Sequence, residues 1–150
     1  MIEPKINLKP GFTAVGMLYY GKNEKNEISE LWGEFNPRIK EIRHIVDGAF
    51  GLCEPADKTG AFRYLAAMAV SDALEIPEGM EVWKVPDQKY AVFPCTLGTI
   101  KTTYHYAFEN WLPQSSYEYT QGYDFEFYDE NFDPEKEGSQ FWIYIPVRER

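Results

Sequence analysis

The feature of this sequence that most constrains its fold is a segment order that occurs twice along the chain. In the first half, residues 12–21 (FTAVGMLYYG) have the composition of a β-strand, and the apolar side chains of residues 28–42 (ISELWGEFNPRIKEI) recur at helical spacing. Pro37 lies inside this amphipathic helix and should kink it or split it just before the proline. Residues 51–60 (GLCEPADKTG) have the composition of a loop, and residues 62–70 (FRYLAAMAV) that of a second strand.

The second half of the chain repeats this order. Residues 81–98 contain a strand that ends near a glycine, and residues 100–112 carry an apolar face at helical spacing. Two strand-like runs follow, at 124–129 and 140–148. Two copies of a β-α-β-β module predict an α+β fold in which two helices pack on one antiparallel sheet, with a pseudo-two-fold between the halves. A ligand pocket is then expected at the junction of the two halves.

Length and composition indicate a single domain that spans residues 1–150. A chain of 150 residues that is 44% hydrophobic is long enough to bury a core. Its longest apolar runs, such as residues 64–70, are far shorter than the roughly 20 residues needed to cross a bilayer, and residues 1–10 lack an apolar signal-peptide core. Cys53 and Cys95 show no partnering pattern, so neither a disulfide framework nor a zinc site is indicated. We therefore expect a cytoplasmic protein that does not associate with a membrane.

The charge of the chain argues against one class of partner and for another. With 15 basic and 24 acidic residues, the formal net charge is −9, whereas a protein that binds nucleic acid needs a basic face to neutralise phosphates. Aromatic residues make up 17% of the chain. Aromatic faces attract cations and carboxylates complete the pairing, so this composition suits an apolar or cationic small molecule. The alternative is that the aromatic side chains simply fill a small core.

The common catalytic and metal-binding signatures are missing from the sequence. There is no GxSxG, no phosphate-binding GxxxxGK[ST], no GxGxxG and no HExxH. His44 and His105 lie far apart in the sequence, and the acidic run at residues 129–138 lacks the regular oxygen spacing of an EF-hand loop. We therefore expect no metal and no cofactor.

The segment YDFEFYDENFD, residues 123–133, places a carboxylate inside a run of strand-forming residues. Successive side chains of a strand point to opposite faces, so Phe125 and Phe127 share one face while Glu126 and Tyr128 share the other. Either the second face meets water and Glu126 has no particular role, or that face lines a cavity and Glu126 is the charge inside it.

Five motifs follow one another along nearly the whole chain: LWGEFNPRI at 31–39, GMEVWKVPDQKYAVF at 79–93, FENWLPQSSYEY at 108–119, YDFEFYDENFD at 123–133 and FWIYIPVR at 141–148. This order resembles the GyrI-like small-molecule-binding family, which includes the effector-binding domains of AraC-type and MerR-type transcription regulators. The resemblance implies a duplicated β-α-β-β fold with an aromatic pocket between the halves. It also implies a buried glutamate, which in multidrug-responsive members engages cationic, lipophilic ligands.

The resemblance assigns the glutamate of this family to Glu126, through the pattern [F/I]-E-x-Y shortly before the last strand, with Tyr128 as its accompanying tyrosine. Glu118, in SSYEY, is the competing candidate. The pocket aromatics are expected to include Trp111 at the end of the second helix, and Tyr20 and Trp32 at related places in the first half. Each of these three fits a core position equally well.

The resemblance leaves more than one function open. Regulators of this family carry a helix-turn-helix domain, for which there is no room before Phe12, so we expect a stand-alone module. In a binding domain, an ionised Glu126 pairs with a cation whose apolar body stacks on aromatic rings. Some stand-alone members resemble hydrolases of cyclopropane-bearing toxins. If this chain is such a hydrolase, Glu126 acts as the general base on a water, and Tyr128 or a nearby tyrosine hydrogen-bonds the developing oxyanion. A module that inhibits a protein partner, still unknown, and a domain with a vestigial pocket are further alternatives.

Overall fold

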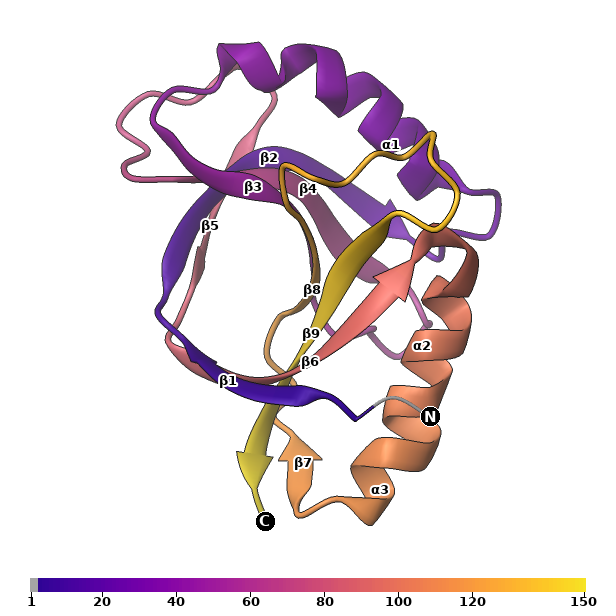
Figure 1. The fold of residues 1–150 in the computed structure, drawn as a ribbon. Coiled ribbons are helices and arrows are strands. Elements are labelled where there is room, and N and C mark those ends of the chain that lie inside the picture. The colour runs from indigo at the N-terminus through magenta and orange to yellow at the C-terminus, as the bar shows by residue number, and fades with distance from the viewer. Residues whose placement is uncertain (1–2) are drawn as a thin grey trace.

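The computed structural model describes residues 3–150 as one curled β-sheet with helices on one of its faces (Figure 1). The strands are β1 (Lys5–Lys9), β2 (Phe12–Gly21), β3 (Ile45–Cys53), β4 (Phe62–Val70), β5 (Glu81–Val85), β6 (Gln88–Thr96), β7 (Tyr117–Tyr119), β8 (Asp124–Tyr128) and β9 (Gln140–Glu149). The helical segments are α1 (Glu27–Phe35), α2 (Ile100–Tyr106) and α3 (Leu112–Gln114), the 3₁₀ segments η1 (Asn36–Glu41) and η2 (Leu97–Thr99), and the π-helical turn η3 (Ala107–Trp111).

The sheet shows the predicted duplication directly. Its strand order is β1-β6-β9-β8-β3-β4-β2-β5, with β7 paired to β9, and every pairing is antiparallel. The unit β2-α1-β3-β4 is repeated as β6-α2-β8-β9, and the order β2-β4-β3 in one half faces the mirrored order β8-β9-β6 in the other. The two halves therefore meet at the β3–β8 pair, where a pseudo-two-fold axis relates them.

Two short strands are exchanged between the halves and curl the sheet. β1 precedes β2 in the chain but pairs with β6, while β5 precedes β6 but pairs with β2. The two links lie close together, because the backbone N–H of Gly11 donates to Asp87 Oδ1 at 2.6 Å. A side chain at Gly11 would meet the carbonyl oxygen of Val85 at 2.7 Å, so this approach requires glycine. The opposite edges of the sheet are thereby drawn together, as Figure 1 shows.

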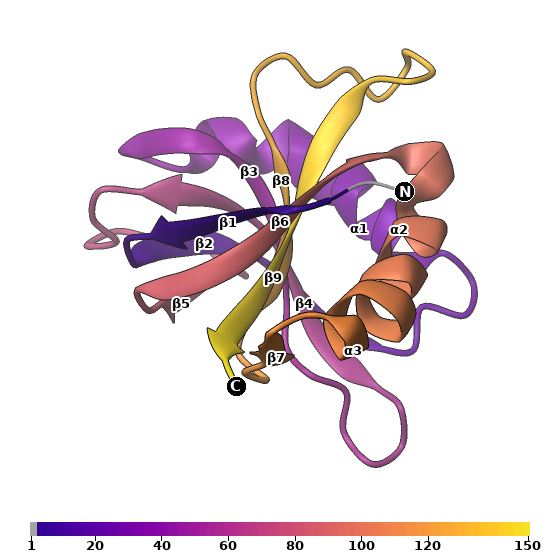
Figure 2. The same cartoon turned by 60° about the horizontal axis from the view of Figure 1, so that its bottom comes forward.

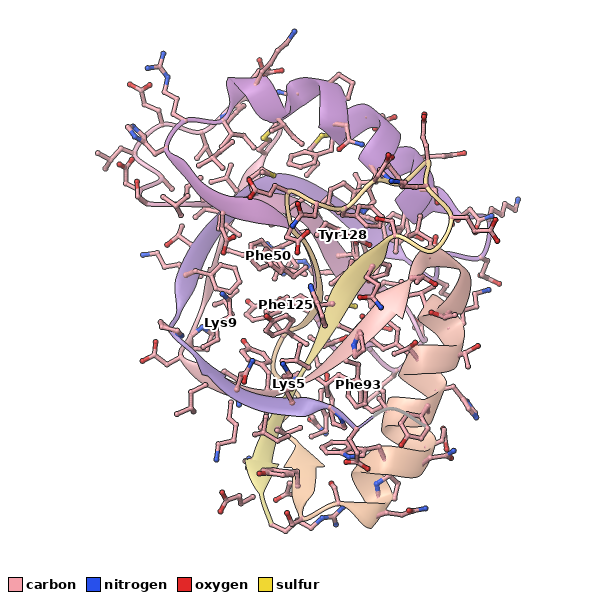
Figure 3. The ribbon with its side chains drawn as sticks, viewed as in Figure 1. Lys5, Lys9, Phe50, Phe93, Phe125 and Tyr128 are labelled. Carbon is pink, nitrogen blue, oxygen red and sulfur yellow. The ribbon has the colours of Figure 1, made fainter. Side chains whose placement is uncertain are left out.

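Alternation along the strands gives the sheet two apolar faces. Phe50 and Phe125 lie on the inside of the curl (Figure 3), and Leu65 belongs to the same core cluster. The other face is covered by the helices: α1 packs on β2 and β4, and α2 packs on β6 (Figure 2). Phe125 and Phe127 lie on the inner face and Glu126 on the helix face, as the period of two predicts.

The boundaries of several elements correct the sequence-based expectations. The helix expected at 28–42 is α-helical only as far as Phe35 and continues as 3₁₀ η1, which agrees with the split expected at Pro37. Residues 51–53, expected in a loop, are instead the end of β3. The glycines of this strand interrupt its run of strand-forming residues, so its composition does not indicate a strand. Strands β1 and β7 were not expected, and residues 81–98 hold two strands. Within residues 3–150, no helix is both long and apolar enough to cross a membrane.

Candidate functional site

Glu126 lies at the centre of the sheet, on the face that the helices cover. Glu126 is buried, with 8% of its surface exposed. In the β3–β8 pairing it lies opposite Gly51, and in the β8–β9 pairing opposite Ile143. A Cβ atom at position 51 would come within 2.6 Å of Glu126 Oε1 and closer still to the Tyr64 hydroxyl. The glycine therefore leaves the space that the buried carboxylate occupies.

Three tyrosine hydroxyls surround the carboxylate of Glu126. Tyr64, from β4, and Tyr128, from β8, each donate to Oε1 at 2.9 Å. Tyr104, from α2, donates to Oε2 over a longer distance of 3.5 Å. The indole N–H of Trp32 on α1 donates to the Tyr64 oxygen at 2.9 Å. Both helices and both halves of the sheet thus contribute to one hydrogen-bonded group, formed by Glu126, Tyr64, Tyr104, Tyr128 and Trp32, which we call the Glu126 cluster.

Burial dominates the electrostatics of the Glu126 cluster and makes the ionised form of Glu126 less favourable than it is in water. Burial raises the pKa of Glu126, and the hydrogen bonds from Tyr64, Tyr128 and Tyr104 act in the opposite direction without cancelling it. Burial, followed by the nearby Glu126 charge, raises the pKa of Tyr64 and Tyr104, so these hydroxyls remain donors. Among residues 3–150, no Lys, Arg or His forms an ion pair with Glu126. The negative charge therefore lacks a counter-ion within the described part of the chain.

A second buried carboxylate lies on the same strand. Asp124 is 8% exposed, precedes Glu126 by two residues and so shares its face, and lies opposite Cys53 in β3. Burial raises the pKa of Asp124 to about 7, and the neighbouring Glu126 adds to the rise. Burial and these two carboxylates also raise the pKa of the Cys53 thiol, which is thus a poor nucleophile.

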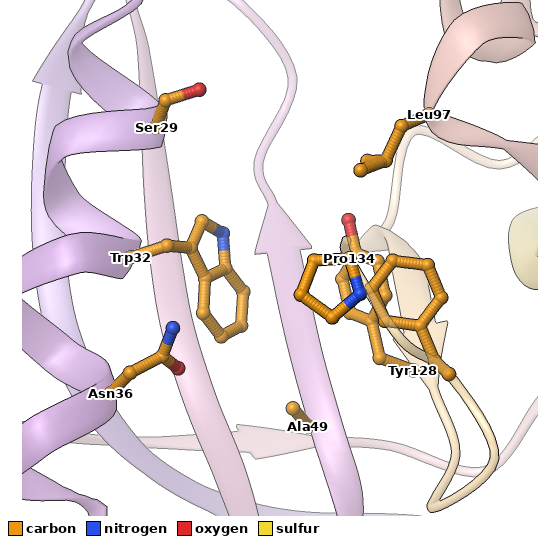
Figure 4. Close-up of a pocket in the computed structure, with 8 residues that line it drawn as sticks. Ser29, Trp32, Asn36, Ala49, Leu97, Tyr128 and Pro134 are labelled. Atoms are coloured by element: carbon orange, nitrogen blue, oxygen red, sulfur yellow. The ribbon is translucent and has the colours of Figure 1, made fainter. Parts of the chain in front are cut away.

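A cavity of about 370 Å³ opens beside the Glu126 cluster (Figure 4). We call it the Trp32 cavity, and its lining comes from both halves of the chain: Ser29, Trp32, Asn36, Ala49, Leu97, Tyr128, Phe132 and Pro134. The rings of Trp32 and Tyr128 meet edge to face, with centroids 5.6 Å apart and an interplanar angle of 75°. Each of these two side chains both lines the cavity and belongs to the Glu126 cluster. They form the wall between the cavity and the carboxylate.

The sequence-predicted residues divide into two groups. Trp32, Glu126 and Tyr128 are brought together at this wall. Tyr20, Trp111 and Glu118 lie elsewhere, and each is engaged by other neighbours.

Tyr20 is 58% exposed and donates from its hydroxyl to Asp57 Oδ2 at 2.5 Å. Trp111 packs with its ring centroid 5.6 Å from that of Phe93, away from the Trp32 cavity. Glu118 accepts from Arg148 Nε at 3.2 Å.

Sequence reasoning missed several members of this site. Tyr64 and Tyr104 are separated from Glu126 by 62 and 22 residues. Only the sheet register and the docking of α2 bring them to the carboxylate, so no local pattern could identify them. Asp124 could have been found, because a second acidic residue two positions before Glu126 in a strand must share its face. Gly51 carried a weaker signal as a glycine inside a strand, which often marks the close approach of another group.

The fold and the site together define a class: a duplicated α+β domain that presents an aromatic cavity beside a buried carboxylate, as small-molecule-binding domains do. Residues 5–147 match the family described as "Cass2: Integron-associated effector binding protein". The chain therefore belongs to this family of effector-binding proteins.

Similar proteins agree with this assignment. Transcriptional regulator BrlR of Pseudomonas aeruginosa is 36% identical over 151 residues, which cover 97% of this chain and 56% of BrlR, so the chain spans about half of that regulator. The structure of SAV2435 bound to tetraphenylphosphonium has a TM-score of 0.79 at 19% identity and covers 98% of this chain and 94% of SAV2435. The integron cassette protein VCH_CASS2 from the mobile metagenome of Vibrio cholerae has a TM-score of 0.70 at 19% identity, covering 97% and 96% of the two chains. At such identities these two structures show the shared fold.

Proposed function

We propose that this domain binds lipophilic cations, with Glu126 as the counter-ion and the rings of Trp32 and Tyr128 as the contact surface for the apolar body. The observation that carries the proposal is a buried carboxylate whose hydrogen-bond partners within residues 3–150 are all neutral hydroxyls. Such a group is costly to ionise until a positive charge arrives. A cationic ligand supplies that charge, whereas an anionic ligand increases the cost.

The Trp32 cavity supports the same proposal through its size and composition. Its volume of about 370 Å³ falls within the range of about 300–1,000 Å³ that is usual for small-molecule sites. Aromatic faces attract cations by about 0.5–2 kcal/mol per contact. The wall formed by Trp32 and Tyr128 lies between cavity and carboxylate, so a ligand in the cavity meets the aromatic rings first. That SAV2435 has been solved with tetraphenylphosphonium, a lipophilic cation, is consistent with this class of ligand.

The hydrolysis of strained, cyclopropane-bearing compounds is the second candidate, because the same arrangement offers a base and hydroxyl donors. A carboxyl group with a raised pKa accepts a proton from water more readily at neutral pH. Attack of the resulting hydroxide on a ring carbon forms a C–O bond and breaks a C–C bond of the cyclopropane, whose electron pair passes to the adjacent carbonyl as an enolate. The hydroxyl of Tyr128 or Tyr104 hydrogen-bonds the enolate oxygen, and the proton that Glu126 took from water returns to the enolate carbon. Both candidates use Glu126, so they differ in whether a product appears.

A matched pair of ions tests the binding proposal. Tetraphenylphosphonium and tetraphenylborate have nearly the same shape and opposite charge. Titration followed by calorimetry or by tryptophan fluorescence should show that the phosphonium binds more tightly. Equal or tighter binding of the borate contradicts the proposal. Incubation with an electrophilic cyclopropane and analysis by mass spectrometry decides the second candidate: a ring-opened product that is lost in Glu126→Gln supports it, and no turnover rejects it.

A further inference from the structure

We infer that the ligand site continues past the Trp32 cavity into an apolar groove, so that its ligands are amphiphilic cations with a long hydrocarbon chain. This inference rests on the proposed binding of a cationic head in the Trp32 cavity and adds the class of ligand. A second hollow, of about 770 Å³, shares Ala49, Tyr128 and Phe132 with that cavity. We call it the Val46 groove. Because the two hollows adjoin, a chain attached to a head in the cavity has a short path into the groove.

The neck between the two hollows is formed by the three shared residues, none of which is charged. Ala49 lies directly opposite Tyr128 in the β3–β8 pair, and its single methyl group leaves room above the strand. Phe132 packs on Tyr128, with ring centroids 4.8 Å apart. A hydrocarbon chain that crosses the neck therefore contacts a methyl group and two aromatic rings, and it displaces water from no charged side chain there.

Beyond the neck, four larger apolar side chains line the Val46 groove: Ile39 of η1, Ile45 and Val46 of β3, and Met68 of β4. Two of them are exposed, Ile45 at 38% and Val46 at 62%. Apolar side chains that are exposed together at the rim of a cavity mark a surface that a ligand or partner covers. Continuity with the Trp32 cavity favours the apolar part of the ligand itself as that cover.

The charge of the lining selects the head group of such an amphiphile. The groove also contains Asp47, Asp129 and Glu130, whereas no Lys, Arg or His is among the described residues that line either hollow. These three carboxylates are not ligand contacts in this inference. Their negative potential opposes the approach of anionic amphiphiles, such as fatty acids and alkyl sulfates, and favours the same hydrocarbon chain on a cationic head.

The length of the groove sets the length of the chain. Along β3, residues 45–49 lead from the neck to the far end of the groove, a span of about 10–13 Å at about 3.3 Å per residue. A decyl chain has a similar length. Full burial of one methylene corresponds to about a fourfold gain in affinity. Since the groove is open on one side, we expect the chain to gain about 100-fold, the equivalent of three to four buried methylenes.

The experiment compares two ligands that share one head, methyltriphenylphosphonium and decyltriphenylphosphonium, by calorimetry below the concentration at which the latter forms micelles. The parent should bind the decyl compound about 100-fold more tightly than the methyl compound. The double variant Ile45→Thr, Val46→Thr keeps the β-branched shapes but places hydroxyl groups along the chain. It should reduce this gain to about tenfold and bind the methyl compound within about twofold of the parent.

The matched control removes the same kind of exposed apolar surface elsewhere. Leu8 and Leu74 are both more exposed than Val46 and line neither hollow. The double variant Leu8→Thr, Leu74→Thr should keep the full gain of the parent. The position of the chain is measured separately with a nitroxide at the end of the decyl group. It should broaden the NMR signals of the Val46 and Met68 amides more than those of Leu8 and Leu74.

The outcomes separate this inference from the proposal on which it rests. Equal affinity of the parent for the two phosphonium compounds, or a chain gain that Ile45→Thr, Val46→Thr leaves unchanged, overturns the inference while cation binding in the Trp32 cavity stands. An equal loss of gain in the leucine control also overturns it, because the chain then binds exposed apolar surface in general. If the parent sediments as a dimer that Ile45→Thr, Val46→Thr splits, a second copy of the chain covers the groove and the inference fails. If neither phosphonium compound binds the parent, the proposed function itself fails.

Discussion

Gly51 lies directly opposite Glu126 in the β3–β8 pair, where the two halves of the fold meet. The two residues occupy equivalent positions in the duplicated module, since β3 corresponds to β8. One half supplies the carboxylate and the other supplies the space for it. The symmetry of the fold is thereby broken at the point where the proposed function requires a single charge in a closed space.

Gly51→Ala tests this relationship. The added methyl group overlaps the Tyr64 hydroxyl and lies 2.6 Å from Glu126 Oε1, and both belong to buried side chains. We expect the free energy of unfolding to fall by about 1–3 kcal/mol, as overpacking of a core does, together with a loss of cation binding. Urea denaturation measures the first effect.

Gly33→Ala is the matched control, because a methyl group there meets nothing within 4 Å. It should raise the free energy of unfolding by about 0.5–1 kcal/mol, through the better helix propensity of alanine. Equal stability of Gly51→Ala and the parent would show that the carboxylate does not need the space over Gly51.

Removing the three tyrosine hydroxyls one at a time should raise the pKa of Glu126 to different extents. Tyr64→Phe and Tyr128→Phe each remove a hydrogen bond of 2.9 Å, while Tyr104→Phe removes one of 3.5 Å. Each bond lowers the pKa of Glu126, so its removal should raise that pKa, most for Tyr64 and least for Tyr104. Carbon-detected NMR titration of the Glu126 carboxyl measures the order. A larger rise in Tyr104→Phe than in Tyr64→Phe contradicts the geometry.

Asp124 predicts a specific dependence of stability on pH. Its pKa is about 7 in the folded protein against an ordinary value of 3.8 for an aspartate, so between these two values the folded state binds more protons than the unfolded state. This contribution to the free energy of unfolding is present below about pH 4 and is lost as the pH rises through 7. The amide of Asp124→Asn does not ionise, so the variant keeps this contribution to the free energy of unfolding at every pH. The variant should match the parent near pH 4 and exceed it by about 2–4 kcal/mol at pH 8, the scale set by 1.36 kcal/mol per unit of pKa.

Thermal or urea unfolding of both proteins across pH 4–8 gives this difference directly. Glu24→Gln, an exposed substitution, serves as the control and should follow the parent at every pH. A constant gap between Asp124→Asn and the parent would mean that Asp124 does not titrate in this range.

The sequence predicts local structure well where a single segment determines it. The bounds of β2 and β4, the end of α1 before Pro37, and the faces of Phe125 and Glu126 follow from composition and period. What it does not predict depends on pairing between distant segments. The exchange of β1 and β5 between the halves, and the convergence of Tyr64 and Tyr104 on Glu126, arise from the sheet register and helix docking.

The assignment of the site itself depends on Glu126, and Glu126→Gln is its most direct test. The amide keeps the shape of the side chain and removes the negative charge. We expect the fold to remain intact and cation binding to weaken by about 1–3 kcal/mol, the scale of a hydrogen bond to a charged group. The free energy of unfolding at neutral pH should stay level or rise, because a buried charge without a counter-ion has been removed. Any hydrolysis should disappear.

Glu118→Gln is the matched control for this test, since Glu118 pairs with Arg148 at the surface and does not line the Trp32 cavity. It should change cation affinity by less than about twofold, because an exposed ion pair contributes little. Titration of both variants with tetraphenylphosphonium at two salt concentrations completes the test. Because the ion pair at Glu126 is buried, the affinity of the parent for this cation should depend little on salt. If Glu118→Gln loses affinity and Glu126→Gln does not, the cation binds at the other glutamate. If neither variant loses affinity, the buried carboxylate serves the packing of the three tyrosines and not the ligand.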